Sequence, residues 1–214
     1  MSYIGRLPIK IPSGVSITLS ENNTSISIEG SHGSKKISPI QGISYKYLKD
    51  SQQIFVQTKS PKFKNFWGLA RTLLSNHLQG VSRGFRLTLN LVGVGYKVQL
   101  GHSVEGQPLP ILEAKYKEKY GENFKVHLDQ DIEGKELIQN LILKLGFSHD
   151  IYLEIPEGVS VTCPHYSTLT LAGNQKDILS QFAAQIRSYR LPEPYKGKGI
   201  LFKDESIRRK QGKN

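Results

Sequence analysis

The chain has 214 residues, of which 37% are hydrophobic, and it carries a formal net charge of +11 with a sequence pI near 9.6. This composition supports one or two folded domains, and the positive charge implies an anionic partner, either nucleic acid or an acidic membrane surface. No apolar run reaches the roughly 18–20 residues needed to span a bilayer. Cys163 is the only cysteine, which excludes an internal disulfide and a cysteine-based zinc site.

A duplicated segment organises the chain. Residues 11–30 read IPSGVSITLSENNTSISIEG, and residues 155–173 read IPEGVSVTCPHYSTLTLAG. Both copies begin with Ile-Pro-x-Gly-Val-Ser and continue as two alternating apolar runs, which are typical of two strands joined by a polar turn. Two copies are too few for a solenoid, so the repeat predicts two related domains.

An amphipathic helix pattern follows each copy of the repeat. After the first copy, apolar residues recur at helical spacing at Phe63, Phe66, Trp67, Ala70, Leu73, Leu74 and Leu78. Gly80 is the predicted end of that helix. After the second copy, the pattern ends before Pro192 and consists of Ile178, Leu179, Phe182, Ala183 and Ile186. Such stripes are typical of a core-facing helix surface rather than of a cofactor site.

Further alternating runs at 85–91, 96–100, 141–145 and 151–155 predict additional strands. Together the patterns predict an α+β fold of two duplicated small domains, each an antiparallel or mixed β-sheet with one packed helix. We expect the first domain at residues 1–82, the second at 83–190, and an extended basic C-terminal strap at 191–214.

Residues 103–136 interrupt the second domain. They contain eight acidic and five basic residues, a net charge of −3, so the whole-chain charge of +11 leaves +14 for the remaining residues. They separate two strand patterns, 96–100 and 141–145, that would otherwise form a hairpin. We interpret this segment as an acidic insertion, partly helical around Leu112–Tyr120, that avoids a polyanionic partner.

Motifs for catalysis or cofactor binding are absent from the sequence. Gly93-Val94-Gly95 leads into a strand pattern and lacks the third glycine and the helix of a dinucleotide fingerprint, so a tight strand turn explains it better. None of the six histidines has metal-site spacing, and there is no G-x-S-x-G nucleophile elbow. We expect no enzyme activity, no catalytic or metal-binding residue, no cofactor and no small-molecule substrate.

The C-terminal segment concentrates the positive charge. Residues 187–214, RSYRLPEPYKGKGILFKDESIRRKQGKN, hold nine Lys or Arg and three Asp or Glu, a net charge of +6. Pro192 and Pro194 favour an extended backbone, and the glycines that follow permit close approach to a partner. Lys196 and Lys198 add point charges and Tyr195 adds a flat apolar face, a combination typical of phosphate-backbone binding. With no major-groove recognition helix evident, we expect shape and phosphate recognition of folded RNA, and a solvated basic tail is the alternative.

Four motifs are specific enough to indicate a family. They are Pro192-Glu193-Pro194-Tyr195-Lys196-Gly197-Lys198-Gly199-Ile200, Leu91-Val92-Gly93-Val94-Gly95-Tyr96-Lys97, Leu145-Gly146-Phe147-Ser148-His149, and the opening Ile4-Gly5-Arg6-Leu7-Pro8 with Ile11-Pro12-Ser13-Gly14-Val15. Together they resemble the bacterial-type L6 family of large-subunit ribosomal proteins. The resemblance covers nearly the whole chain except about 103–136.

The resemblance implies a structural role in the large ribosomal subunit. In that family the protein binds large-subunit rRNA near the stalk base, beside the sarcin–ricin loop where translational GTPases dock, and it neighbours other large-subunit proteins. The second domain and the C-terminal strap make most of the rRNA contacts. With the basic tail included, the expected rRNA-binding residues of this chain are Lys97, His149, Arg187, Arg190, Tyr195, Lys196, Gly197, Lys198, Gly199, Lys203, Arg208, Arg209 and Lys210.

The acidic insertion departs from the family pattern and bears on the source compartment. The opening MSYIGRLPIK has neither an apolar secretory core nor the Arg/Ser-rich pattern of a transit peptide. An expanded ribosomal protein without a transit peptide suggests an organelle-encoded copy. We expect the mitochondrial matrix, with a plastid or the bacterial cytoplasm as alternatives.

Two other function classes stay open at this point. A free-standing RNA chaperone or regulator would bind RNA without a fixed stoichiometry. A protein on an anionic membrane would need a basic amphipathic helix with an exposed apolar face. The helix at 177–189 is expected to direct its apolar stripe to its own sheet, so we expect no membrane partner.

Overall fold

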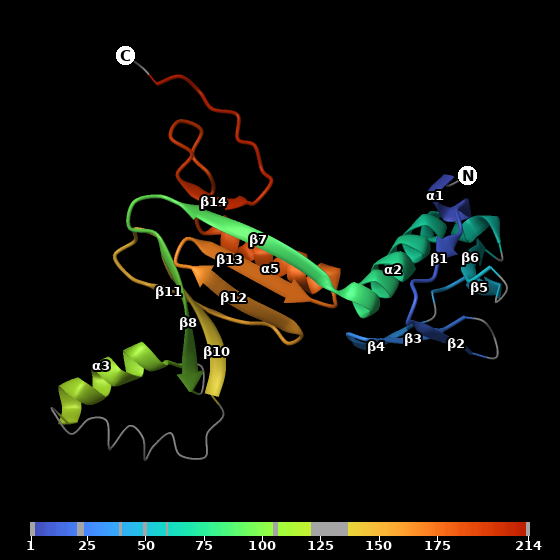
Figure 1. The fold of residues 1–214 in the computed structure, drawn as a ribbon, viewed down its shortest axis with the longest axis horizontal. Helices are drawn as coiled ribbons and strands as arrows, with labels where there is room; N and C mark the ends of the chain where they lie inside the picture. The colour runs from blue at the N-terminus through green and yellow to red at the C-terminus, as the bar shows by residue number, and fades with distance from the viewer. Residues whose placement is uncertain are drawn as a thin grey trace. The chain divides into compact units, whose positions relative to one another are not determined.

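A computed structural model describes residues 3–20, 24–38, 40–48, 51–58, 60–104, 107–120 and 137–212 (Figure 1). The chain forms two compact units. Unit 1 comprises residues 1–86 and 172–179, and unit 2 comprises residues 87–171 and 180–214. The sequence pattern predicts contiguous domains, whereas residues 172–179 group with unit 1, where Lys35 Nζ donates a hydrogen bond to Gln175 Oε1 at 2.8 Å.

Unit 1 contains two small antiparallel sheets and one long helix. The strand orders are β1-β6-β5 and β2-β3-β4. The first repeat copy forms the β2–β3 hairpin, in which Ser16 pairs with Glu29 and Leu19 with Ile26. The elements are α1 (Tyr3–Arg6), β1 (Ile9–Lys10), β2 (Ser16–Leu19), β3 (Ile26–Gly30), β4 (Gly33–Ile37), β5 (Ile43–Leu48), β6 (Gln53–Thr58), the 3-10 helix η1 (Pro61–Phe63) and α2 (Lys64–Arg83).

Helix α2 packs one apolar stripe against the core of unit 1. Ala70, Leu74 and Leu78 recur every four residues and are buried, as the predicted stripe requires. The prediction that Gly80 ends this helix is wrong, because α2 continues to Arg83. A Cβ at Gly80 would overlap the backbone carbonyl oxygen of Asn174. Close approach of the backbone, rather than helix termination, therefore explains this glycine.

Two four-stranded sheets form the framework of unit 2, in the orders β12-β13-β7-β14 and β11-β10-β8-β9. The elements are β7 (Phe85–Val92), β8 (Lys97–Val104), β9 (Gln107–Pro108), α3 (Leu109–Tyr120), β10 (Leu137–Lys144), β11 (Ile151–Glu154), β12 (Val159–His165), β13 (Thr168–Gly173), α5 (Lys176–Ser188) and β14 (Gly199–Phe202). Helix α5 lies along one face of the first sheet (Figure 1). Four members of its predicted stripe are buried, namely Leu179, Phe182, Ala183 and Ile186. The predicted α+β fold class is confirmed.

The strands on either side of the acidic insertion pair with each other as a long hairpin. β8 and β10 pair antiparallel over their whole length, from Lys97 opposite Lys144 to Val104 opposite Leu137. The segment between the two strands therefore does not prevent them from pairing as a hairpin. Helix α3 (Leu109–Tyr120) confirms the helix predicted around residues 112–120. Residues 121–136 of the predicted insertion lie outside the described residues.

The C-terminal strap contributes a strand to the sheet of unit 2. β14 pairs antiparallel with β7, with Gly199 opposite Val92 and Phe202 opposite Leu89. Gly199, Ile200 and Leu201 are buried. The sequence pattern places these residues in an extension beyond the second domain, but the apolar Ile-Leu-Phe run inside the basic segment packs into the core.

Candidate nucleic-acid interface

Three loops of unit 2 meet around the ring of Tyr96, a residue that is only 2% exposed. Tyr96 lies in the β7–β8 turn, and a Cβ at Gly146 in the β10–β11 turn would lie 3.4 Å from its Cε1. A Cβ at Gly93 would lie 2.9 Å from Tyr96 Cδ2 and 3.1 Å from Cγ of Lys198, which belongs to the loop before β14. The three family-like motifs of this unit, far apart in sequence, therefore form one surface.

Two cations contact aromatic rings at this surface. Arg190 Nε donates a hydrogen bond to Tyr96 Oη at 3.0 Å, and its guanidinium carbon lies 5.0 Å from the centroid of the Phe147 ring. Lys198 Nζ lies 4.8 Å from the centroid of the Tyr96 ring. Both arrangements are cation–π contacts. Among the described residues, neither cation forms an ion pair with a carboxylate, so both charges remain available to an external anion.

Residues 193–198 form a loop that its own backbone closes. The Glu193 N–H donates to the Lys198 carbonyl oxygen at 2.9 Å, and the Gly197 N–H donates to the Glu193 carbonyl oxygen at 3.0 Å. Tyr195 and Lys196 are exposed within this loop, and Lys198 is half-buried. Because the loop is already ordered, binding through these side chains costs less conformational entropy than binding through a free tail.

Gly197 in the loop and Gly199 at the start of β14 are buried, unlike the loop lysines. Gly199 has a φ of 150°, and a Cβ there would lie 2.6 Å from Pro192 Cα and 2.7 Å from the Leu191 carbonyl oxygen. The structure therefore gives Gly199 a packing role, since only glycine lets the chain turn from the loop into β14. Contact of Gly197 and Gly199 with RNA stays a prediction.

The basic tail folds back onto this loop. The Lys210 N–H donates to the Pro194 carbonyl oxygen at 2.9 Å, and a Cβ at Gly197 would lie 3.4 Å from Arg209 Nη2. Arg208, Arg209 and Lys210 are all exposed, so the tail adds three cations beside the loop. Lys203 is also exposed, and its N–H donates to the Thr88 carbonyl oxygen at 3.0 Å just beyond β14.

Arg187 differs from the other predicted cations because unit 2 already provides its partner. Its Nη2 lies 2.5 Å from Glu205 Oε1, and its guanidinium carbon lies 5.5 Å from the centroid of the Phe202 ring. Glu205 Oε2 also accepts a hydrogen bond from the Phe202 N–H at 3.2 Å. Pairing with this carboxylate competes with pairing to phosphate, so these contacts favour a structural role for Arg187.

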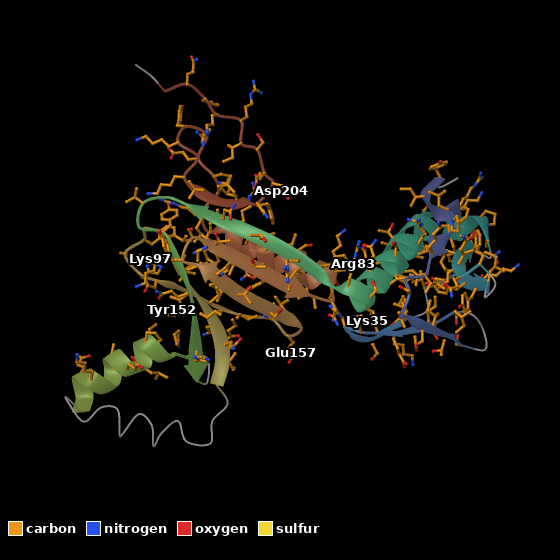
Figure 2. All side chains as sticks on the ribbon, in the orientation of Figure 1. Lys35, Arg83, Lys97, Tyr152, Glu157 and Asp204 are labelled. Atoms are coloured by element: carbon orange, nitrogen blue, oxygen red, sulfur yellow. The ribbon has the colours of Figure 1, made fainter. Side chains whose placement is uncertain are left out.

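Lys97 and His149 occupy exposed positions at the ends of the two strand turns. The imidazole of His149 stacks on the Phe147 ring, with centroids 6.2 Å apart and planes inclined by 24°. Figure 2 shows Lys97 at the start of β8 and Tyr152 on β11, two positions that the strand register places near the same end of the second sheet.

Sequence reasoning named Tyr195 but missed the other aromatic side chains of this surface. Tyr96 and Phe147 stand inside the two glycine-containing motifs, which was a usable signal for both. Tyr152 and Tyr189 stand in a strand and at a helix end, where an aromatic residue is usually part of the core. Only the folded chain brings Tyr96 and Phe147 to Arg190 and Lys198, and places Tyr152 and Tyr189 around one cavity with Phe147.

Shifted pKa values occur elsewhere in the molecule. Burial raises the pKa of Tyr45 and of the Cys163 thiol. Burial, with a smaller contribution from Lys35, lowers the pKa of His77, and Asp177 partly opposes that shift. In the described part of the chain, no cluster of three His, Cys, Asp or Glu side chains could hold a metal ion, and no helix is long and apolar enough to span a membrane.

Comparisons with known proteins agree on one family. The family described as Ribosomal protein L6 matches residues 121–203. The large ribosomal subunit protein uL6 of Clostridioides difficile is 37% identical over 217 residues, covering 100% of this chain and 98% of that protein. The uL6 proteins of Parvibaculum lavamentivorans and Xanthobacter autotrophicus are 33% and 32% identical over 213 residues, each covering 100% of this chain and 99% of its relative.

Proposed function

Because the chain belongs to the ribosomal protein L6 family, we propose that it is a non-enzymatic structural component of the large ribosomal subunit that binds large-subunit rRNA. One observation carries the proposed mode of binding. Arg190 and Lys198 converge on Tyr96, next to a closed loop that exposes Tyr195 and Lys196. This surface combines uncompensated positive charge with aromatic faces, which is the chemistry that recognises folded RNA.

Phosphate groups are the proposed ligands of the cations. Lys196 and Lys198 on the loop, with Arg208, Arg209 and Lys210 on the tail, neutralise phosphates and release their counterions. Contacts of this kind position the protein but do not distinguish one base from another, so recognition depends on RNA shape. Lys97, His149 and Lys203 extend the same surface. Gly197 and Gly199 shape the loop, and Arg187 stabilises the turn after β14 through Glu205.

The family resemblance supports a proposed location within the subunit. We place the chain near the stalk base, beside the sarcin–ricin loop and next to other large-subunit proteins, where it supports the region in which translational GTPases dock. Unit 2 faces the rRNA in this arrangement. Chemical footprinting of reconstituted subunits with and without the chain tests the placement, and protection elsewhere in the rRNA would contradict it.

We propose a mitochondrial ribosome as the host particle, on the strength of the acidic insertion. A plastid is the second choice, and the bacterial cytoplasm is favoured instead by the bacterial relatives reported above. Immunodetection in ribosomes purified from each compartment decides among the three. Detection in the cytoplasmic particles of a bacterium would remove the organelle proposal and leave the ribosomal role unchanged.

Sedimentation of a lysate through a sucrose gradient in high salt tests the ribosomal role. We expect the chain to run with the large subunit at about one copy per particle, as an integral component must. An unrelated large-subunit protein, probed in the same fractions, is the control for intact particles. If the chain stays at the top of the gradient while the control protein sediments, the free RNA chaperone becomes the better description.

A further inference from the structure

A cavity of about 400 Å³ opens beside the cation cluster of unit 2. It lies between the β10–β11 turn, the start of β11 and the chain just after α5, and it is lined by Phe147, His149, Asp150, Ile151, Tyr152 and Tyr189. Its volume falls in the range of roughly 300–1,000 Å³ that is usual for small-molecule sites. The cavity is therefore large enough for one small ligand.

Aromatic rings dominate the lining of this cavity. Phe147 is 42% exposed, and His149 is exposed as well, so part of each ring is accessible to solvent. The one carboxylate, that of Asp150, lies 3.2 Å from Lys144 Nζ. This ion pair screens the negative charge and leaves the carboxylate as a hydrogen-bond acceptor.

Positive charge flanks the cavity near Tyr189 and Phe147. Tyr189 in the lining directly precedes Arg190, whose guanidinium group lies over the Phe147 ring. Lys198 lies over the ring of Tyr96, and the Tyr96 hydroxyl accepts a hydrogen bond from Arg190. A ligand that fits both features has an anionic group attached to a flat apolar ring that carries hydrogen-bond donors.

A nucleotide combines these two features. We propose that the cavity binds one unpaired base of the rRNA, with the base stacked against its aromatic lining and the adjoining phosphate at Arg190 and Lys198. An amine on the base edge donates to Asp150. This inference rests on the proposed rRNA binding and adds a pocket for a base to contacts that otherwise involve only phosphates.

The test uses the full-length chain and two short oligoribonucleotides of equal length. One is an adenosine oligomer with a single 2-aminopurine, and the other carries the same phosphates without bases. We expect the base-containing oligomer to bind roughly ten-fold more tightly, within the range that stacking on aromatic side chains contributes per base. We also expect quenching of the 2-aminopurine fluorescence on binding, which is the signature of a stacked base.

A double variant, Tyr152→Leu with Tyr189→Leu, should remove most of that base-dependent gain and the quenching. Its affinity for the abasic oligomer should stay unchanged, because the cations are intact. Tyr166→Leu is the matched control, since Tyr166 is an exposed tyrosine of unit 2 that lies outside the cavity. Both tyrosines of the double variant are only partly buried, and circular dichroism checks that it folds.

The outcomes separate this inference from the proposal on which it rests. Equal affinity for both oligomers in the unsubstituted chain, or a base-dependent gain that survives the double variant, would overturn the base pocket while leaving phosphate binding in place. The cavity would then be free for an apolar side chain of a neighbouring ribosomal protein. Failure to bind either oligomer at low salt would also overturn the base pocket, while the ribosomal role is decided separately by the sedimentation test.

Discussion

Units 1 and 2 repeat one design but use their surfaces differently. The first repeat copy forms β2–β3 and is followed by α2, and the second forms β12–β13 and is followed by α5. In the described residues, unit 2 contains a cluster in which Arg190 and Lys198 contact the rings of Tyr96 and Phe147. This cluster lies next to the closed basic loop. The shared strands and helices thus provide stability, whereas the turns at one end of unit 2 form the surface that we propose for rRNA binding.

The largest expected effect is a loss of stability at the glycine in each unit where the backbone is packed against other backbone atoms. Gly80→Ala in unit 1 and Gly199→Ala in unit 2 should each lower the free energy of unfolding by about 2–3 kcal/mol, because the added Cβ meets backbone atoms that cannot move away. Chemical denaturation measures both losses. Gly212→Ala is the control, since a Cβ there meets nothing within 4 Å. Losses no larger than that of the control would contradict the packing account.

Arg187 and Arg190 distinguish stability from binding within unit 2. Arg187→Ala should cost about 1–2 kcal/mol of stability, since it leaves Glu205 without its partner in a partly buried site. Arg190→Ala should mainly weaken rRNA binding. Thermal melts and filter-binding titrations measure the two effects. Glu205→Gln is the control for Arg187, because it breaks the same ion pair and keeps every cation. A loss of rRNA affinity in Arg187→Ala without loss in Glu205→Gln would assign Arg187 to the RNA.

Removing the charge of the loop lysines of unit 2 should weaken rRNA binding, whereas removing lysines from the strands of unit 1 should not. For Lys196→Ala with Lys198→Ala, the slope of log affinity against log salt should fall by roughly 0.7–0.9 for each phosphate that the variant no longer neutralises. The matched control is Lys36→Ala with Lys46→Ala, which removes two exposed lysines from strands of unit 1. An unchanged slope in the loop variant, or an equal change in the control, would show that these loop lysines do not meet phosphates.

The smallest expected effect is a pH dependence confined to unit 1. The pKa of His77 is lowered in the folded chain, so the neutral form is favoured there. The folding stability is therefore at its full value above the unfolded pKa of about 6.5. It falls as pH drops below about 6.5 toward the lower folded pKa, because the unfolded chain binds the proton first. His77→Gln should therefore flatten the fall in stability between neutral and mildly acidic pH, measured by denaturation. His165→Gln, at an exposed position of unit 2, is the control, and identical pH profiles for His77→Gln and the unsubstituted chain would contradict the prediction.

Much of the fold was predictable because strands and helices follow local periodicity. The alternation of residues in the repeat predicts β2–β3 and β12–β13, and the spacing of Leu74, Leu78, Phe182 and Ile186 predicts the core faces of α2 and α5. Gly80 was misinterpreted for a physical reason. Glycine marks either the end of a helix or a close approach, and only the position of Asn174 decides between these two roles.

The cationic residues of the candidate site could be identified from the sequence, but whether each one has a structural or a binding role could not. Charge and motif select Arg187, Arg190 and Lys198 alike. Their difference depends on partners far away in the chain, Glu205 for Arg187 and Tyr96 for the other two. The cavity formed by Phe147, Tyr152 and Tyr189 has no sequence signature, because its walls come from a turn, a strand and a helix end.

The sequence by itself determined the α+β class, the duplication, the interrupting acidic segment and the basic C-terminal segment, since each depends on composition or on residues near one another in the chain. Tertiary structure alone decided that Ile200 and Leu201 enter the sheet, that the tail returns to Pro194, and that Arg187 is neutralised. Those outcomes depend on which distant groups reach one another once the core is packed. A charged side chain becomes structural or functional according to the partner it then meets.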